Sequence, residues 1–335
     1  MNYSALNDVL QFIHDHRSFV IFIHEKPDGD AVGSSTALAL FLRSLDRKAV
    51  IASPTPISRR LSFAAAADVP YICNKEALAK VDADAALTVD VASDAMLGDL
   101  ASALPFPIGY ALDHHKVHTV TAEAKYVDAA ASACGEIIFS LISLYAMITG
   151  AECFTQRIAA ALYTAIASDT GCFRYGNTTA DTHDMAQKLF TLGIDAEGIN
   201  RALFEVKPLS QIRTERMGYE KLRLFYHDRL AVVGFTRADL EKIGATDDDT
   251  DTVAQMVRMI EGVEIGVLMR EKLLPDGKKV YKFSVRGNTS ADMAALCACF
   301  GGGGHKKAAG CTIDADYETA MAKFVEAAAD YVTEG

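Results

Sequence analysis

The chain has 335 residues, half of them apolar, so it is long enough for two domains that each bury their own core. Its net charge of −11 argues against a broad surface that coats long duplex nucleic acid. No apolar run is long enough to span a membrane, no secretion signal opens the chain, and seven cysteines in mostly apolar segments indicate the reduced thiols of a cytoplasmic protein.

The first half alternates short apolar runs with helix-like stretches, which is typical of parallel βα units. The continuous apolar run Phe19–Ile23 indicates a strand that is buried on both faces. We predict strands over Phe19–His24, Ala49–Ala52, Ala85–Asp90 and Ile108–Asp113. We predict helices over Ala31–Leu45, Cys134–Ile148, Gln156–Ser168, Asp181–Leu192 and Ala196–Phe204.

The second half begins with a charged stretch, Pro208–Tyr226, that we interpret as a connecting helix. Strands are predicted over Leu230–Phe235, Glu264–Arg270 and Lys279–Val285, with the last two joined as a hairpin. The predicted fold is therefore α/β with two domains: a parallel-sheet domain over 1–207, a connecting helix over 208–228 and a smaller mixed-sheet domain over 229–335. Two unlike domains joined by a helix imply a cleft, where we expect the active site.

Acidic and histidine side chains stand at the ends of four segments of the first domain. They are His24, Asp28 and Asp30 after the first strand, Asp90 after the third, Asp113-His114-His115 after the fourth, and Asp169 at the end of a helix. Because the carboxyl ends of parallel strands share one edge of a sheet, we expect these side chains to meet there. Asp30 taken alone also fits the N-cap of the helix that follows it.

Such a cluster indicates a metal site. Carboxylates with some imidazoles and no thiolate suit manganese better than zinc, with magnesium or cobalt as alternatives. So many carboxylates can share a site only if their charge is offset, and two divalent metal ions about 4 Å apart would offset it. Two such ions can hold a hydroxide that attacks phosphorus and can polarise a phosphoryl oxygen, which predicts hydrolysis of a phosphate ester.

A glycine run in the second half, Gly301–Gly304, is followed by His305, Lys306 and Lys307. Consecutive glycines let backbone N–H groups approach an anion closely, although a flexible linker is the plainer alternative. The run lies in a basic segment, because 266–310 holds eight Lys or Arg against three acidic residues. Arg286 ends a strand in this segment and could grip a phosphate, or form a surface salt bridge.

Taken together, these motifs resemble the DHH phosphoesterase superfamily, in the branch whose DHH-associated C-terminal domain carries a GGGH motif. The resemblance implies that His24 and Asp28 hold one metal, that Asp30 and His114 hold the other, and that Asp90 and Asp169 are shared or adjacent. It further implies catalytic roles for His115, which faces the scissile phosphate, and for Asp113, which orients a histidine. The substrate phosphate would be bound by Arg286, Gly302, Gly303, Gly304 and His305.

Within this branch the chain is similar to oligoribonucleases that degrade short single-stranded RNA of about two to five nucleotides to mononucleotides and dephosphorylate pAp to AMP. Alternatives are a phosphodiesterase for linear or cyclic dinucleotides such as pApA or c-di-AMP, a short-chain exopolyphosphatase, and a nucleotide sensor without activity. Phe173 and Tyr175 are candidates for stacking on a base, or for core packing. A homodimer is left open.

Overall fold

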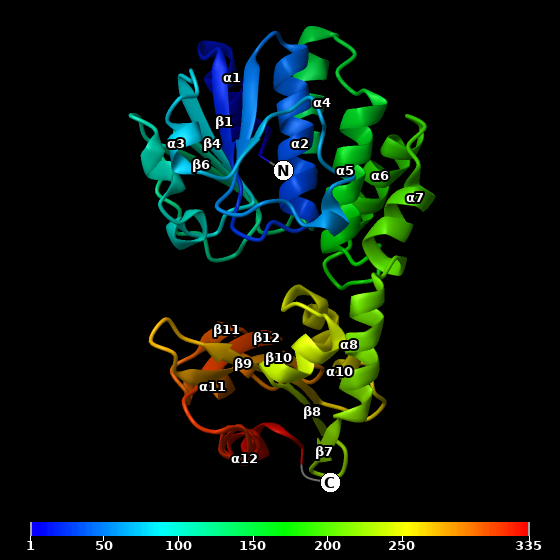
Figure 1. Ribbon diagram of the computed structural model, residues 1–335. Helices are drawn as coiled ribbons and strands as arrows, with labels where there is room; N and C mark the ends of the chain where they lie inside the picture. Colours follow the sequence, from blue (N-terminus) through cyan, green and yellow to red (C-terminus); the bar gives the residue numbers. More distant parts are fainter. Residues whose placement is uncertain (1, 334–335) are drawn as a thin grey trace. The chain divides into compact units, whose positions relative to one another are not determined.

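The computed structural model describes residues 2–333, and the chain divides into two compact units, Met1–Val206 and Lys207–Gly335 (Figure 1). Each unit contains one sheet with an apolar core on either face. The first sheet is parallel throughout and the second is mixed, which confirms the predicted α/β class. Within 2–333 no helix combines the length and apolar content that a membrane crossing requires.

The first sheet has the strand order β3-β2-β1-β4-β5-β6. Its strands are β1 (Ser18–Phe22), β2 (Lys48–Ala52), β3 (Tyr71–Ile72), β4 (Ala85–Val89), β5 (Tyr110–Asp113) and β6 (Ala124–Val127). The order reverses between β1 and β4, and a parallel sheet opens a crevice for ligands at the carboxyl ends of the strands at such a point. Along β1, Phe19 and Ile21 enter one core while Val20 and Phe22 enter the other, as strand periodicity dictates.

Seven α-helices accompany this sheet in the described residues. They are α1 (Tyr3–Asp15), α2 (Gly29–Ser44), α3 (Lys75–Leu78), α4 (Cys134–Thr149), α5 (Gln156–Asp169), α6 (Ala180–Phe190) and α7 (Ala196–Asn200). Helix α2 packs closely on α5 because Gly33 has no side chain: a Cβ there would lie 2.5 Å from the Ala161 carbonyl oxygen. Gly135 of α4 plays the same part, since its Cβ would meet that of Ala165 at 2.6 Å.

The second sheet has the order β11-β12-β10-β9-β8-β7, and only β8 and β9 run parallel among its pairs in the described chain. Its strands are β7 (Arg223–Phe225), β8 (Leu230–Phe235), β9 (Ile265–Leu273), β10 (Lys279–Gly287), β11 (Gly303–His305) and β12 (Ala308–Ile313). Its helices are α8 (Leu209–Glu220), α9 (Arg237–Ile243), α10 (Asp251–Arg258), α11 (Met293–Ala298) and α12 (Tyr317–Ala328).

One element of the second unit differs from the sequence prediction. The helix predicted through residue 228 is wrong beyond Glu220, because Arg223–Phe225 pairs with β8 instead. The alternation of polar and apolar residues over Lys221–Leu224 favours this strand. The glycine run is not a linker: Gly303–His305 forms β11, which turns back onto β12.

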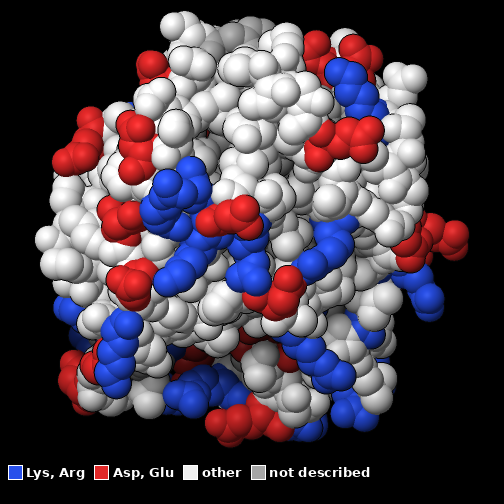
Figure 2. All heavy atoms as spheres, turned by 90° about the horizontal axis from the view of Figure 1, so that it is seen from above, with Lys and Arg blue, Asp and Glu red and all other residues white. Residues whose placement is uncertain are grey.

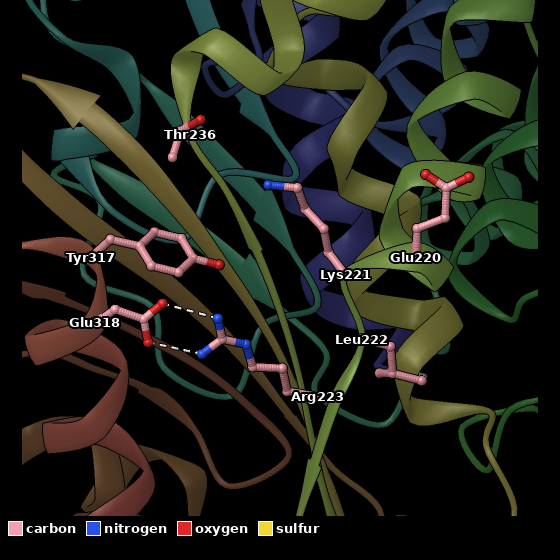
Figure 3. Close-up of a pocket in the computed structure, with 7 residues that line it drawn as sticks. All are labelled: Glu220, Lys221, Leu222, Arg223, Thr236, Tyr317 and Glu318. Carbon is pink, nitrogen blue, oxygen red and sulfur yellow. Dashed lines mark hydrogen bonds and ion pairs between the residues drawn. The ribbon is translucent and has the colours of Figure 1, made fainter.

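Charges of both signs lie on the face of the molecule that is seen from above (Figure 2). On the face shown in Figure 2, Lys and Arg lie among Asp and Glu and form no uninterrupted basic area. A hollow of about 430 Å³ lies in the second unit (Figure 3). Its cations are already paired, since Arg223 binds Glu318 through two contacts of 2.8 and 2.9 Å and Lys221 binds Asp239 at 2.6 Å. It therefore offers little free positive charge to an anionic substrate.

Candidate metal centre

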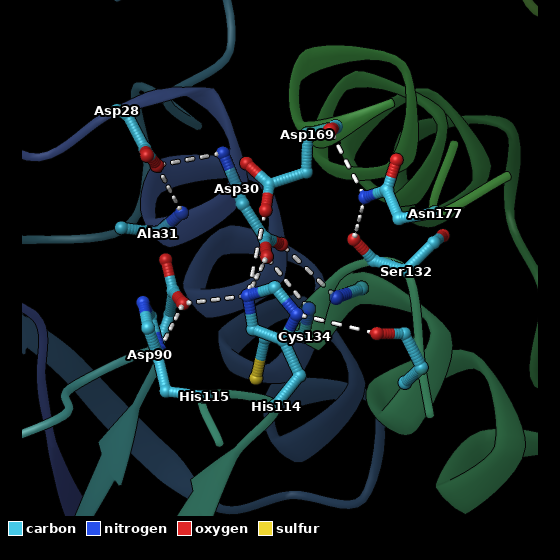
Figure 4. A network of polar contacts seen from close by, with 12 residues as sticks. Asp28, Asp30, Ala31, Asp90, His114, His115, Ser132, Cys134, Asp169 and Asn177 are labelled. Carbon is cyan, nitrogen blue, oxygen red and sulfur yellow. Dashed lines mark hydrogen bonds and ion pairs between the residues drawn. The ribbon is translucent and has the colours of Figure 1, made fainter. Parts of the chain in front are cut away.

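The predicted site residues of the first unit meet at the carboxyl edge of the parallel sheet (Figure 4). Segments far apart in the chain contribute to this metal centre: the β1–α2 turn, the ends of β4 and β5, and the end of α5. Three overlapping groups of side chains there are each able to hold a metal ion. They are His24 with Asp28 and Asp90, Asp30 with His114 and Asp169, and Asp90 with His114 and His115.

The first group is arranged around the Nε2 atom of His24. This atom lies 3.9 Å from Oδ1 of Asp28 and 3.8 Å from Oδ2 of Asp90. The other ring nitrogen, Nδ1, lies 2.7 Å from the Glu25 carbonyl oxygen. This contact engages Nδ1 and leaves Nε2, beside the two carboxylates, as the ring atom that would bind a metal ion, as in metal-binding histidines.

The second group is arranged around His114. Its Nε2 atom lies 3.6 Å from Asp30, 3.5 Å from Oδ1 of Asp90 and 3.4 Å from Asp169. These distances exceed those of good hydrogen bonds. Atoms that bind one divalent ion at about 2.1 Å lie roughly 3 Å or more from one another, so the spacing suits a shared cation.

Asp90 belongs to two of the three groups, those of His24 and of His115, with Oδ2 toward His24 and Oδ1 toward His114. Its side chain is 3 % exposed, and its Oδ1 is buried without a hydrogen-bond partner among the described residues. Its backbone has φ +59°, a left-handed conformation that costs energy in a residue other than glycine. A buried, strained and unsatisfied carboxylate fits a position between two cations, so this set of donor atoms suits divalent metal ions.

Without a cation, the cluster perturbs its own titration. Burial alone would lower the pKa of His24 and of His114, but the surrounding carboxylates raise it to about 9 and about 10 respectively. Burial, with the charge of Asp90, raises the pKa of Asp30 to about 8. Burial, with the charges of Asp30, Asp28 and Asp90, raises the pKa of Asp169 to about 9. The concentrated negative charge is therefore costly unless protons or cations neutralise it.

The N-cap role that the sequence suggested for Asp30 is wrong, because Asp28 fills it. The N-cap of α2 is Asp28, whose Oδ1 accepts the backbone N–H groups of Asp30 and Ala31, each at 3.0 Å. Asp30 is fully buried and accepts the N–H groups of Cys134 at 2.6 Å and Gly135 at 3.0 Å. Asp30 thus supplies acceptors to the first turn of α4, which Ala133 cannot cap.

Asp113 lies behind the cluster and is fully buried. Its Oδ1 accepts a hydrogen bond from Nδ1 of His115 at 2.7 Å and one from the backbone N–H of His114 at 2.8 Å. Its Oδ2 faces Nε2 of His118 at 3.7 Å. His118 was not predicted from the sequence, because its spacing from Asp113-His114-His115 matches no motif that would indicate a functional role.

A second polar layer beneath the cluster was also missed. Asn177 donates to the carbonyl oxygens of Asp169 at 3.2 Å and Ser132 at 3.0 Å (Figure 4). Glu136, which is 2 % exposed, accepts from the hydroxyl and N–H of Ser132 and from the Thr182 hydroxyl at 2.6 Å. This layer could have been predicted from Glu136, because a single glutamate within the otherwise apolar helix 134–149 indicates a buried carboxylate with polar partners.

The predicted substrate-binding residues lie in the second unit and share one row of its sheet. Arg286 of β10 and His305 of β11 both pair with Ala308 of β12. Directly paired residues point to the same face, so the two cationic or polar side chains flank one methyl group, roughly 10 Å apart. Gly302 and Gly304 are needed by the hairpin itself, since a Cβ there would lie 2.2 and 2.7 Å from the carbonyl oxygens of Gly310 and Ala308.

Comparison with known proteins finds matches to both units of the chain. Residues 18–166 match the model of the N-terminal domain of the DHH family, and residues 229–334 match that of the DHHA1 domain. The bifunctional oligoribonuclease and PAP phosphatase NrnA of Thermus thermophilus is 30% identical over 318 residues, 93% of this chain and 90% of that protein. Its namesake from Bacillus subtilis is 26% identical over 314 residues, 91% and 92% of the two chains.

A solved structure extends the likeness to the fold. The crystal structure of an exopolyphosphatase-related protein from Bacteroides fragilis is 22% identical and matches with a TM-score of 0.87. The match covers 98% of this chain and 97% of that one. Both domains of the chain therefore have counterparts of known architecture.

Proposed function

The chain belongs to the DHH family of phosphoesterases, and we propose that it hydrolyses very short oligoribonucleotides to mononucleotides and dephosphorylates pAp to AMP. Relatives named for these two activities match this chain over at least 90% of their own length. The observation that carries the proposal is the position of Asp90. This residue is buried and strained, and its two carboxylate oxygens face two different histidines.

Two divalent cations, preferably manganese, would be held by the predicted metal ligands. These ligands are His24, Asp28, Asp30, Asp90, His114 and Asp169. When bound, the ions would supply positive charge that polarises a phosphoryl oxygen and lowers the pKa of a nearby water molecule. The mixture of carboxylate and imidazole ligands favours manganese over magnesium, which prefers oxygen ligands alone.

His115 would act on the phosphate itself. Its Nδ1–H is held by Asp113, so Nε2 remains available to a phosphoryl oxygen or a leaving group. The His115 side chain is 33 % exposed, compared with 13 % for His114, and can therefore be reached from solvent. The hydrogen bond to Asp113 raises the pKa of His115, which favours a protonated ring that stabilises developing negative charge.

A second phosphate of the substrate would be gripped by the DHHA1 domain. Arg286 and His305, on one face of its sheet, are proposed to bind it together with the backbone of Gly302–Gly304. A grip on an additional phosphate suits pAp and a 5′-phosphorylated dinucleotide, which carry two phosphates on or near one sugar.

The proposal is tested by incubating the protein and manganese with a labelled dinucleotide, pAp, pApA, c-di-AMP, oligoadenylate and tripolyphosphate. We expect mononucleotide release from the dinucleotide and AMP from pAp, and much less product from c-di-AMP and tripolyphosphate. His114→Ala should abolish product while the protein stays folded. Failure of the folded, metal-loaded protein to cleave either preferred substrate would refute the proposal, and faster cleavage of c-di-AMP or tripolyphosphate would replace it with that activity.

A further inference from the structure

The turn that follows Asp169 is fixed tightly to the end of α5. Gly171, Cys172 and Phe173 all have positive φ, at +56°, +60° and +62°. The Cys172 N–H donates to the Ala167 carbonyl oxygen at 2.7 Å, and the side chain of Asn177 ties the far end of the turn to the Asp169 carbonyl oxygen. A strained turn held at both ends, directly after a proposed metal ligand, presents its side chains in a defined orientation.

The side chain that this turn presents is Tyr175. A Cβ built on Gly171 would lie 2.3 Å from Cζ of Tyr175 and 2.5 and 2.6 Å from its two Cε atoms. Three neighbouring ring atoms at nearly equal distances mean that the ring lies face-on to the glycine. Tyr175 nevertheless keeps 43 % of its surface exposed. The glycine therefore seats one face of the ring and leaves other ring surface open to solvent.

The other aromatic residue of the turn is already used for packing. The ring of Phe173 stacks on His183, with centroids 5.5 Å apart and planes inclined by 25°. It also contacts Tyr163, at a centroid distance of 5.8 Å. Of the two residues that the sequence suggested for base stacking, the structure leaves Tyr175 free for a ligand.

We propose that Tyr175 is a stacking platform for the nucleobase of the substrate, and that it makes the enzyme prefer nucleotides over base-free phosphates. The inference rests on the proposed function, in which the scissile phosphate belongs to a nucleotide. A ring held on the backbone loses little conformational entropy when a base stacks on it. Because every base has a π face, the platform favours nucleotides without selecting one sequence.

The test compares Tyr175→Ala, Tyr175→Phe and the wild-type protein in manganese, with pAp and its abasic analogue, a base-free sugar 3,5-bisphosphate. For Tyr175→Ala we expect the KM for pAp to rise about tenfold with kcat little changed, since stacking holds the base and not the reacting phosphate. The KM for the abasic analogue should not change, and Tyr175→Phe should stay within about twofold of wild type. Phe190→Ala, an exposed aromatic residue of the same unit, serves as a control.

A merely structural role would show differently, because a displaced turn would move Asp169 and lower kcat on both substrates. Equal effects on pAp and the abasic analogue, or none on either, would overturn the inference. Binding of AMP measured by calorimetry does not require turnover, and it should weaken about tenfold in Tyr175→Ala. If wild type cleaves neither substrate, the proposed function fails, whereas unchanged AMP binding in Tyr175→Ala refutes the stacking role independently.

Discussion

Oδ1 of Asp113 lies 2.7 Å from Nδ1 of His115 and 2.8 Å from the backbone nitrogen of His114. One oxygen atom thus orients the ring of His115 and the backbone of His114. Burial alone would raise the pKa of Asp113, but the hydrogen bond and charge of His115 lower it, so the carboxylate is ionised at neutral pH. The relationship links the proposed phosphate-facing residue to the proposed metal ligand beside it.

Asp113→Asn should lower kcat about 10- to 100-fold and leave KM nearly unchanged, because a carboxamide holds His115 less firmly in its tautomer. Steady-state kinetics on pAp with saturating manganese measure this effect. The control is Asp82→Asn, because the side chain of Asp82 is 97 % exposed. A drop in metal affinity equal to the drop in kcat would instead assign Asp113 to the metal ligands.

Asp90→Asn should have opposite effects on metal binding and on the stability of the metal-free protein. Metal affinity should fall by about 100-fold, because two of the three ligand groups lose the carboxylate that they share. The metal-free protein should melt about 2–4 °C higher, because a neutral amide removes the cost of burying the Asp90 charge and its repulsion with Asp28, roughly 1 kcal/mol in all, and asparagine tolerates a positive φ. Thermal unfolding in chelator and calorimetric metal titration check the two signs, and a lower melting point would contradict the repulsion argument.

Asp30→Ala should differ from Asp169→Ala even when no metal is bound. Asp30 accepts hydrogen bonds from Cys134, Gly135 and Ser34, so alanine leaves buried donors unsatisfied. We expect a loss of about 3 kcal/mol, or roughly 6–12 °C in melting temperature. The substitution Asp169→Ala should lower the stability little, because the Asp169 side chain is 25 % exposed. Equal melting temperatures of the two variants in chelator would show that Asp30 has no such structural role.

The metal affinity should rise with pH. The pKa values of His24 and His114 are raised to about 9 and about 10 without metal, and a divalent ion binds only the neutral imidazole. Protons must therefore leave when the metal binds, most of all below pH 9. Calorimetry of manganese binding in buffers of different ionisation enthalpy counts the released protons, and binding without proton release would exclude these histidines as ligands.

The stability of the metal-free protein should change in the opposite direction. Protonation of His24 and His114 favours the folded state fully below about pH 6.5, and this effect is lost as the pH rises through about 9 for His24 and about 10 for His114. Asp30 and Asp169, with pKa values raised to about 8 and about 9, resist ionisation and penalise folding as the pH rises. Melting temperatures in chelator should fall from pH 6 to pH 9, and Asp90→Asn should flatten the slope.

Arg286→Ala should raise the KM for pAp about tenfold and leave manganese affinity unchanged, since Arg286 is proposed to bind a phosphate and not a metal. Arg237→Ala is the matched control, because it removes the same charge from an exposed position in the same unit. The ratio of the two KM values tests whether Arg286 acts through its position or through net charge alone.

The sequence was sufficient to predict which segments meet at the candidate metal centre, for a physical reason. Four apolar runs read as parallel strands, and parallel strands place their carboxyl ends on one edge, so Asp90 and Asp113 had to lie near His24. The division of labour between Asp28 and Asp30 was beyond prediction. It depends on where the first turn of α4 lies, and Cys134 is more than a hundred residues away from Asp30.

Other features could not be predicted because glycine and histidine carry ambiguous signals. The run Gly301–Gly304 has no side chains to show strand alternation, so the hairpin of β11 and β12 was hidden. His118 resembles any surface histidine until Oδ2 of Asp113 is found opposite it. The different roles of Phe173 and Tyr175 could likewise not be predicted, since both lie in one short turn and only the structure shows that Phe173 is packed and Tyr175 exposed.

The bonds from Asp30 to Cys134 and Gly135 also bear on how the protein is made. Asp30 leaves the ribosome about a hundred residues before Cys134 and Gly135, whose N–H groups will donate hydrogen bonds to it, and Asp169 emerges later still. A nascent chain up to that point holds only part of the carboxylate set, so it can bind a divalent ion only weakly. Metal loading is therefore expected to follow completion of the first domain.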